Sequence, residues 1–147
     1  MLQEGENFLK SLDGYENLRA CTIATGFKIL GKRWTIEIVR QIFLGDAKFN
    51  ELLKNTMGIN PRMLSLRLKE LEHHGLVERK VIGGTPVNIT YSLTGPGREI
   101  IPVMYSMSKF TMKNFPKEVF NDGKSRTPEQ LTNELVRASS RGRYSFP

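Results

Sequence analysis

The sequence contains a single cysteine and no long apolar segment, and these two absences exclude whole classes of protein. Cys21 cannot form a disulfide within its own chain, so a disulfide-stabilised secreted scaffold is excluded. The uncharged apolar stretches are far shorter than the roughly 20 residues that span a bilayer. Residues 1–20, with four acidic and two basic side chains, are unlike a signal peptide. We therefore expect a cytoplasmic protein that has no contact with a membrane.

The signatures of an enzyme are also missing. No glycine-rich phosphate loop follows an expected strand, and no nucleophile has a suitable base nearby in the sequence. His73 and His74 are adjacent, so on a helix they point about 100° apart and cannot share a metal ion as histidines four residues apart can. We expect no catalytic activity, no metal site and no cofactor.

The chain has instead an excess of positive charge, which is unevenly distributed. The formal net charge is +7. Residues 1–20 carry two basic and four acidic side chains (−2), residues 21–116 carry fourteen and seven (+7), and residues 117–147 carry six and four (+2). A basic folded domain favours polyanions such as nucleic acid, because attraction to phosphates is the sequence-independent part of DNA affinity. A basic surface that serves only solubility is the alternative.

The spacing of apolar residues predicts a fold that is mainly α with a small antiparallel β-hairpin (α+β). The length of 147 residues suits one domain with flanking segments. We expect a helical extension within residues 1–20, helices at 22–30, 35–44, 48–55 and 61–74, paired strands at 76–82 and 87–93, a helix from Thr94 to about 115 with a kink at Pro102, a linker at 121–126, a short helix at 130–138 and an unstructured tail at 139–147.

The helix that begins at Pro61 has the best marked boundary. Asn60 can accept a hydrogen bond from a backbone N–H, and proline at the first helical position loses no needed donor. Leu64, Leu68 and Leu71 share one face, and Gly75 can end the helix in the left-handed conformation. The opposite face carries residues suited to reading base edges, because arginine can bind guanine and leucine can contact a thymine methyl. These residues are Arg62, Ser65, Leu66 and Lys69.

The hairpin that follows resembles the wing of a winged helix-turn-helix protein. Its first strand carries Arg79 and Lys80, and Gly83 and Gly84 lie at its tip, where backbone N–H groups can approach phosphates closely. The residues that we expect to contact phosphates are Asn60, Arg67, Arg79 and Lys80, with Thr85 and Asn88 at the wing. The alternative for the polar face of the helix is an ordinary solvated surface, and the alternative for Gly83 and Gly84 is a tight turn that makes no contact with DNA.

Several short motifs together resemble the HxlR family of winged helix-turn-helix transcriptional regulators, which are related to MarR proteins. They are Cys21, Ile29-Leu30-Gly31-Lys32-Arg33-Trp34, Phe49-Asn50-Glu51-Leu52, Ile59-Asn60-Pro61-Arg62-Met63-Leu64, Leu68-Lys69-Glu70-Leu71-Glu72, Gly75-Leu76-Val77 and Tyr91-Ser92-Leu93-Thr94. The resemblance covers roughly residues 21–110. It implies a homodimer that binds a palindromic operator in double-stranded DNA, with N-terminal and C-terminal helices at the dimer interface. This chain has Pro86-Val87-Asn88 where the family carries a basic residue in the wing.

These expectations divide the chain into three parts. Residues 1–20 are an N-terminal helical extension, residues 21–116 are the winged helix-turn-helix domain with a dimerisation helix, and residues 117–147 are a C-terminal linker, short helix and tail. The helix after Thr94 has more apolar and methionine side chains than one edge of a short domain can cover, which favours dimerisation over burial within the monomer.

Cys21 and Trp34 each have two interpretations. The resemblance implies that a cysteine placed like Cys21 can sense oxidants or electrophiles, which here requires an intermolecular disulfide or an adduct because no second cysteine exists. The alternative is a small buried side chain at a helix start. Trp34 is interpreted as a core anchor between the first two helices of the domain rather than a residue that stacks on a ligand. Any small-molecule or redox effector is unidentified.

The sequence therefore predicts a transcriptional regulator that binds duplex DNA specifically and is not an enzyme. One alternative is a chromatin-type protein that coats DNA without preference, for which selection of bound genomic DNA enriches no palindrome. Another is a winged-helix module that binds proteins, for which no mobility shift with duplex DNA occurs even at low salt.

Overall fold

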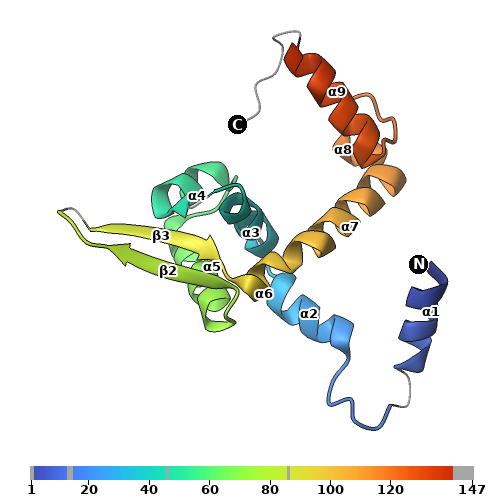
Figure 1. Cartoon of the computed structure of the whole chain (residues 1–147), viewed down its shortest axis with the longest axis horizontal. Helices are drawn as coiled ribbons and strands as arrows, with labels where there is room; N and C mark the ends of the chain where they lie inside the picture. The colour runs from blue at the N-terminus through green and yellow to red at the C-terminus, as the bar shows by residue number, and fades with distance from the viewer. Residues whose placement is uncertain (1, 13–14, 46, 86, 141–147) are drawn as a thin grey trace.

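The computed structural model describes residues 2–12, 15–45, 47–85 and 87–140. The helices are α1 (Leu2–Ser11), α2 (Thr22–Leu30), α3 (Thr35–Phe43), α4 (Phe49–Asn55), α5 (Pro61–His73), α6 (Gly95–Arg98), α7 (Ile100–Asn114), α8 (Pro116–Val119) and α9 (Pro128–Ser140), and the strands are β1 (Ala47–Lys48), β2 (Val77–Ile82) and β3 (Asn88–Leu93). The β2–β3 hairpin extends from one side of a globular part, and α7 leaves it on the other side with α8 and α9 at its far end (Figure 1).

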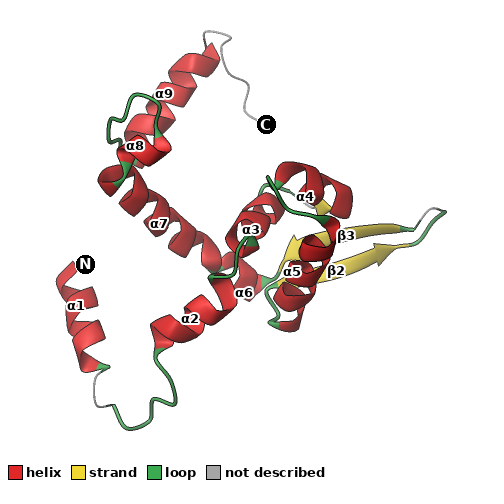
Figure 2. Ribbon diagram, turned by 180° about the vertical axis from the view of Figure 1, so that it is seen from behind, coloured by secondary structure: helices red, strands yellow, loops and turns green. Residues whose placement is uncertain are grey.

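The hydrophobic core lies between α3, α4, α5 and the sheet. Ile38 and Val39 of α3 are fully buried, and Leu64, Leu68 and Leu71 of α5 face them. This confirms the predicted leucine face of α5. From behind, α5 is seen to lie along the sheet with α3 and α4 beside it (Figure 2). The core therefore fixes which face of α5 is left for solvent.

Local signals set the ends of α5 as predicted. The backbone N–H of Met63 donates to Asn60 Oδ1 at 2.8 Å, and Pro61 is the first helical residue. The helix stops at His73, and Gly75 has a φ of +68°, which glycine adopts without the steric penalty of a Cβ atom. The observed helix differs from the predicted one by a single residue at its C-terminus.

Among the described residues, the sheet has three strands in the order β1-β3-β2, one more than the sequence predicts. The hairpin pairs Val77 with Leu93 and Ile82 with Asn88 at its two ends. β1 adds Ala47 opposite Tyr91 on the other edge of β3. A strand of two residues is too short to show an alternating pattern, which is why β1 could not be predicted.

The predicted helix from Thr94 is divided into α6 and α7. Thr94 caps α6 as expected, because its Oγ1 accepts from the backbone N–H of Gly97 at 3.1 Å. The division falls at Glu99, whereas the expected kink was at Pro102. Pro102 has no N–H to donate to the carbonyl of Arg98, so the helical bonding is interrupted just before the proline. α8 was not predicted.

The C-terminal segment contains the predicted last helix. The Thr127 backbone N–H donates to Gln130 Oε1 at 2.8 Å, and the Gln130 N–H donates to Thr127 Oγ1 at 3.2 Å, which is a reciprocal cap. Ser139 and Ser140 belong to α9 rather than to a tail, and residues 141–147 lie outside the described residues. No helix in the described part of the chain is long and apolar enough to cross a membrane.

Candidate nucleic-acid interface

α4, the turn at 56–60 and α5 form a helix-turn-helix in which α5 presents a polar face to solvent. Arg62, Ser65 and Lys69 are exposed on this face, and Leu66 keeps 44% of its surface exposed. The core holds the opposite, leucine face of the helix. The structure therefore brings together all four residues predicted to read base edges, and we call them the α5 reading face.

A hollow of about 490 Å³ joins the α5 reading face to the sheet. Ser65 and Lys69 line it from α5, and Arg79 lines it from β2. The other lining residues are Phe49, Leu68, Glu72, Ile89 and Tyr91. A cation of the wing thus borders the same depression as the reading face, as expected if both meet one duplex.

Arg79 and Lys80 lie on opposite faces of the hairpin, because side chains alternate along a strand. Arg79 pairs across to the buried Tyr91, whereas Lys80 pairs across to Thr90. Lys80 Nζ lies 3.0 Å from Glu78 Oε1, and Ser92 Oγ donates to the same carboxylate at 2.9 Å. The Lys80 ammonium, followed by Ser92, lowers the pKa of Glu78. The structure therefore does not bring Lys80 together with the α5 reading face.

The end of the wing carries the remaining predicted contacts. Thr85 is exposed in the loop, and Asn88 is the exposed first residue of β3. Asn60, at the start of α5, is exposed as well, but its side-chain oxygen is used in the helix cap. Only its amide N–H groups are left to meet a phosphate oxygen.

Arg67 departs from the prediction that it contacts phosphates. Its side chain is only 12% exposed and faces the turn between α2 and α3. Arg67 Nε donates to the carbonyl of Arg33 at 3.1 Å, and its terminal nitrogen lies 2.7 Å from Glu70 Oε2. Lys32 Nζ lies 2.7 Å from the other oxygen of Glu70. Arg67 therefore serves the fold, as part of a cluster that holds α5 against the α2–α3 turn.

The cluster of Lys32, Arg67 and Glu70 predicts that the stability of the fold depends on pH. The hydrogen bond from Lys32 and, to a smaller extent, the one from Arg67 lower the pKa of Glu70. A lowered pKa in the folded state stabilises the fold above the ordinary carboxyl pKa, and this contribution is lost as the pH falls through the folded value. We expect Glu70→Gln to lower the melting temperature by roughly 2–5 °C at pH 7. The difference from wild type should shrink as the pH is lowered towards 3.

Thermal unfolding at several pH values checks this, with Glu72→Gln as the control on the same helix. Glu72 is exposed, so its replacement should leave the melting temperature nearly unchanged at every pH. A constant difference for Glu70→Gln across the pH range would contradict an ionic role for this carboxylate.

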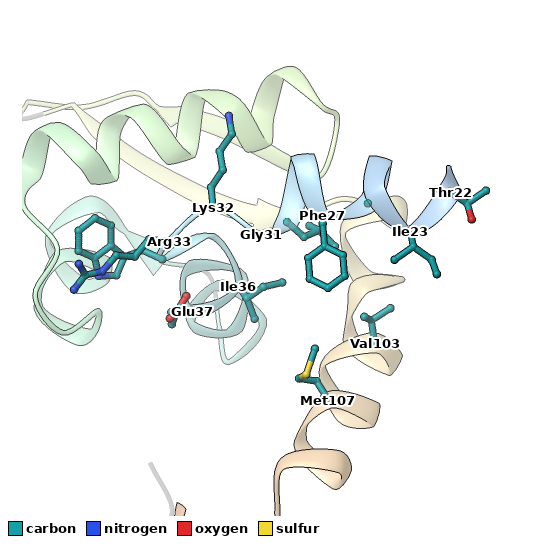
Figure 3. Close-up of a pocket in the computed structure, with 13 residues that line it drawn as sticks. Thr22, Ile23, Phe27, Gly31, Lys32, Arg33, Ile36, Glu37, Val103 and Met107 are labelled. Carbon is teal, nitrogen blue, oxygen red and sulfur yellow. The ribbon is translucent and has the colours of Figure 1, made fainter. Parts of the chain in front are cut away.

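A second hollow, of about 510 Å³, lies between α2, the α2–α3 turn and α7. Its walls are mainly apolar, with Ile23 and Phe27 from α2 and Val103 and Met107 from α7, and each of these four is about half exposed or more. Lys32, Arg33 and Glu37 line the hollow as well. Phe27, Ile36 and Met107 surround the same opening (Figure 3). We call this feature the α2–α7 groove.

Trp34 packs against the core, which agrees with an anchoring role, but it links different elements from those expected. Its Nε1–H donates to the carbonyl of Met57 at 3.2 Å and so ties the α2–α3 turn to the turn of the helix-turn-helix. The Arg33 guanidinium lies 4.3 Å from the centre of its ring. Trp34 also lines the α2–α7 groove, so it connects the groove with the turn before α5.

Cys21 is exposed, which contradicts the interpretation of a small buried side chain. It occupies the position before α2, and its carbonyl accepts from the Oγ1 of Thr25 at 2.9 Å. The next residue, Thr22, lines the α2–α7 groove. No group of histidine, cysteine and carboxylate residues able to hold a metal occurs in the described part of the chain.

A helix-turn-helix with an exposed, partly basic second helix and a hairpin beside it defines a DNA-binding winged-helix protein. Residues 29–119 match the HxlR-like helix-turn-helix family. The chain therefore belongs to the HxlR family of helix-turn-helix transcriptional regulators. This confirms the resemblance recognised in the sequence.

Individual relatives agree with this assignment. The chain is 45% identical over 82 residues to the HTH-type transcriptional regulator YvaP of Bacillus subtilis. The aligned region covers 56% of this chain and 76% of YvaP. The reduced form of the transcriptional regulator YodB of Bacillus subtilis matches with a TM-score of 0.60 and 33% identity, over 67% of this chain and 96% of YodB. YodB is also known in diamide-treated and quinone-bound forms. A regulator of the MarR family from Porphyromonas gingivalis W83 matches with a TM-score of 0.62 and 30% identity, over 67% and 97% of the two chains.

Proposed function

We propose that this regulator binds a palindromic operator as a homodimer, with one α5 helix in each of two successive major grooves. The observation that carries the proposal is the α5 reading face, with Arg62, Ser65, Leu66 and Lys69 exposed together and Arg79 on the wall of the adjoining hollow. Arginine and lysine suit guanine and phosphate oxygens, and leucine suits the thymine methyl. Thr85, Asn88 and the Asn60 amide are proposed as backbone contacts.

The α2–α7 groove supports the homodimer. Ile23, Phe27, Val103 and Met107 leave about half or more of their surface in water, although monomers rarely expose contiguous apolar patches of this kind. A second copy related by a two-fold axis would cover the groove with the same surface, because such interfaces are self-complementary. The two reading faces would then meet half-sites about one helical turn, roughly 34 Å, apart.

Cys21 is proposed as the site through which an oxidant or electrophile changes DNA affinity. Its exposed thiol lies beside Thr22 of the α2–α7 groove, so an adduct or an intermolecular disulfide there would alter the surface proposed for dimerisation. The diamide-treated and quinone-bound forms of YodB show that a relative has been studied with such reagents.

Selection of bound duplexes from fragmented genomic DNA tests these proposals together. Wild type is expected to enrich an inverted repeat, and the enrichment should change under diamide for wild type but not for Cys21→Ser. Binding without an enriched repeat would favour a protein that coats DNA, and no binding even at low salt would favour a protein-interaction module. An identical response of Cys21→Ser would remove the cysteine from sensing.

Single substitutions separate base reading from phosphate binding. Arg62→Ala is expected to weaken binding to the selected operator by about 1–3 kcal/mol, with a smaller effect on random DNA. Arg79→Ala is expected to weaken binding to the operator and to random DNA alike. It should also reduce the number of ions released on DNA binding by about one, which lowers the dependence of the affinity on salt. Titrations at several salt concentrations measure both effects.

Lys80→Ala is the matched control for Arg79→Ala. Lys80 is the neighbouring cation on the same strand, but its charge is offset by Glu78 and it lies on the other face. Lys80→Ala should therefore weaken DNA binding less than Arg79→Ala does. Equal losses of Arg62→Ala on operator and random DNA would contradict the base-reading role of Arg62.

A further inference from the structure

The end of the wing is apolar and uncharged, although it belongs to a basic protein. The sequence has no charged residue from position 81 to position 97, in a chain of net charge +7. Val81, Ile82 and Val87 are 56%, 51% and 62% exposed, and we call them the wing-tip residues. In both views the ends of β2 and β3 extend beyond α4 and α5 (Figures 1 and 2). Exposed apolar side chains gathered at one place on a folded domain mark a contact surface.

The wing-tip residues cover both faces of a thin ribbon. Val81 lies on the same face of β2 as Arg79, because side chains alternate along a strand, and Ile82 lies on the opposite face. Val87 directly precedes β3. The two glycines that follow Ile82 carry no side chain, so the leading end of the ribbon is narrow.

The wing tip continues the surface that we propose for DNA binding. Arg79 lines the hollow that also contains Ser65 and Lys69 of the α5 reading face. Val81 pairs across the hairpin with Ile89, which lines the same hollow. When α5 lies in a major groove, the part of the wing that carries Arg79 therefore crosses the adjoining phosphate backbone. The tip beyond it then meets the next groove, which is the minor groove.

The minor groove suits an apolar tip of this kind. Deoxyribose C–H groups form its walls, and apolar side chains that enter it push base steps apart and bend the duplex. A cation at the tip would gain most in the narrow groove of an A-tract, where the negative potential is strongest. An uncharged tip gains nothing from that potential and needs a groove that opens easily. Pyrimidine–purine steps such as TA deform most easily.

We propose that the wing-tip residues enter the minor groove beside each half-site and select easily deformed steps by apolar contact with the sugars. This rests on the operator binding proposed above. The apolar contact takes the place of the cationic wing contact that the family resemblance implies. The wing tip thus supplies sequence preference without adding to the salt dependence of binding.

Two footprinting reagents separate the wing tip from α5. Hydroxyl radicals attack deoxyribose from the minor groove, whereas dimethyl sulfate methylates guanine N7 in the major groove. Wild type is expected to protect guanines within each half-site of the selected operator and sugars of the adjoining minor groove. The double variant Val81→Ala/Val87→Ala should lose the sugar protection and keep the guanine protection. It should also bind roughly tenfold more weakly with an unchanged salt dependence.

Two operators test the preference for deformable DNA. They differ only in a short segment under the wing, located by the sugar protection, which reads AAAA in one and TATA in the other. Both present the same minor-groove acceptors, because A·T and T·A pairs look alike from that side. Wild type is expected to bind the TATA operator roughly three- to tenfold more tightly.

A charge at the tip should reverse this preference. Val87→Lys is expected to bind the AAAA operator more tightly than the TATA operator, because its ammonium group favours the narrow groove. Val136→Lys adds the same charge at an exposed valine of α9 and should keep the preference of wild type. Val87 and Val136 are exposed, and Val87 lies outside both strands of the hairpin, so neither change should unfold the domain.

The outcomes separate this inference from operator binding by α5. Wild type that protects no guanine in any half-site would overturn both. Sugar protection that survives in the double alanine variant would overturn the wing-tip contact alone. Equal binding of wild type to the AAAA and TATA operators would overturn it as well. So would a double alanine variant that binds every operator like wild type, which would leave the wing tip to a protein partner.

Discussion

Replacing Gly97 with alanine is expected to lower the melting temperature of the protein by roughly 10 °C or more. Gly97 is buried in α6, and a Cβ atom there would overlap the carbonyl oxygen of Leu76, the residue just before β2. Backbone cannot move aside as a flexible side chain can. The same contact region includes the Thr94 N–H, which donates to the Leu76 carbonyl at 3.2 Å, and the Thr94 Oγ1, which donates to the Gly75 carbonyl. Alanine would therefore push α6 away from the end of α5.

Gly95→Ala is the matched control, because it lies in the same short helix and no atom beyond its two chain neighbours lies within 4 Å of an added Cβ. Its melting temperature should fall far less than that of Gly97→Ala, because the only new contact of the methyl group is with the ring of the adjacent Pro96. Thermal unfolding of both variants measures the contrast. Similar melting temperatures for the two would show that α6 can shift without loss, and that α7 is not fixed to the DNA-binding part at this point.

The parts of the fold that the sequence could predict are those with local signals. Asn60, Pro61 and Gly75 mark the ends of α5, and the spacing of its leucines defines the core face. The leucine face of α5 is enough to predict the α5 reading face, because the reading face is the opposite side of the same helix. This is why its four residues are found together and exposed in the structure.

The placement of Arg67 and Lys80 away from the α5 reading face follows from signals that the sequence does contain. On a helical wheel Arg67 lies only about 40° from Leu71, which places it beside the core rather than on the reading face. The alternation of a strand likewise separates Lys80 from Arg79. The partners of Arg67, however, depend on how α5 meets the α2–α3 turn, and no local pattern specifies that meeting.

The contacts between distant segments could not be predicted. The close approach of Gly97 to Leu76 and the hydrogen bond from Trp34 to Met57 join residues far apart in the sequence, and neither has a periodic signature. The α2–α7 groove is likewise formed by residues that are far apart in the sequence. The sequence indicates that α7 is too apolar for a monomer surface, but only the structure shows that Phe27 of α2 and Met107 of α7 share one hollow.

The groove leads to the prediction with the largest expected effect on DNA binding. Phe27→Asp is expected to convert the dimer to a monomer and to weaken operator binding by at least roughly 100-fold, because two half-sites held by one dimer bind as a unit. Phe27 is 61% exposed, so the folded monomer loses little when a carboxylate replaces the ring. In the dimer, the same carboxylate would lose water beside the apolar side chains of Ile23 and Met107.

Leu44→Asp controls for the introduction of a charge in place of an exposed apolar side chain. Leu44 is 58% exposed, follows α3 and does not line the groove. It should leave both the dimer and operator binding close to wild type. Met107→Asp, on the α7 wall of the groove, should reproduce the effect of Phe27→Asp.

Sedimentation equilibrium and titration with the selected operator measure the two effects separately. If the groove is the dimer interface, Phe27→Asp and Met107→Asp should lose dimerisation and operator affinity together, while each keeps the weaker affinity for random DNA that a single reading face provides. A dimeric Phe27→Asp protein would show that the second copy covers another surface. A monomeric variant that still bound the operator with wild-type affinity would show that one reading face and one wing are enough, and the palindrome would then have no role in recognition.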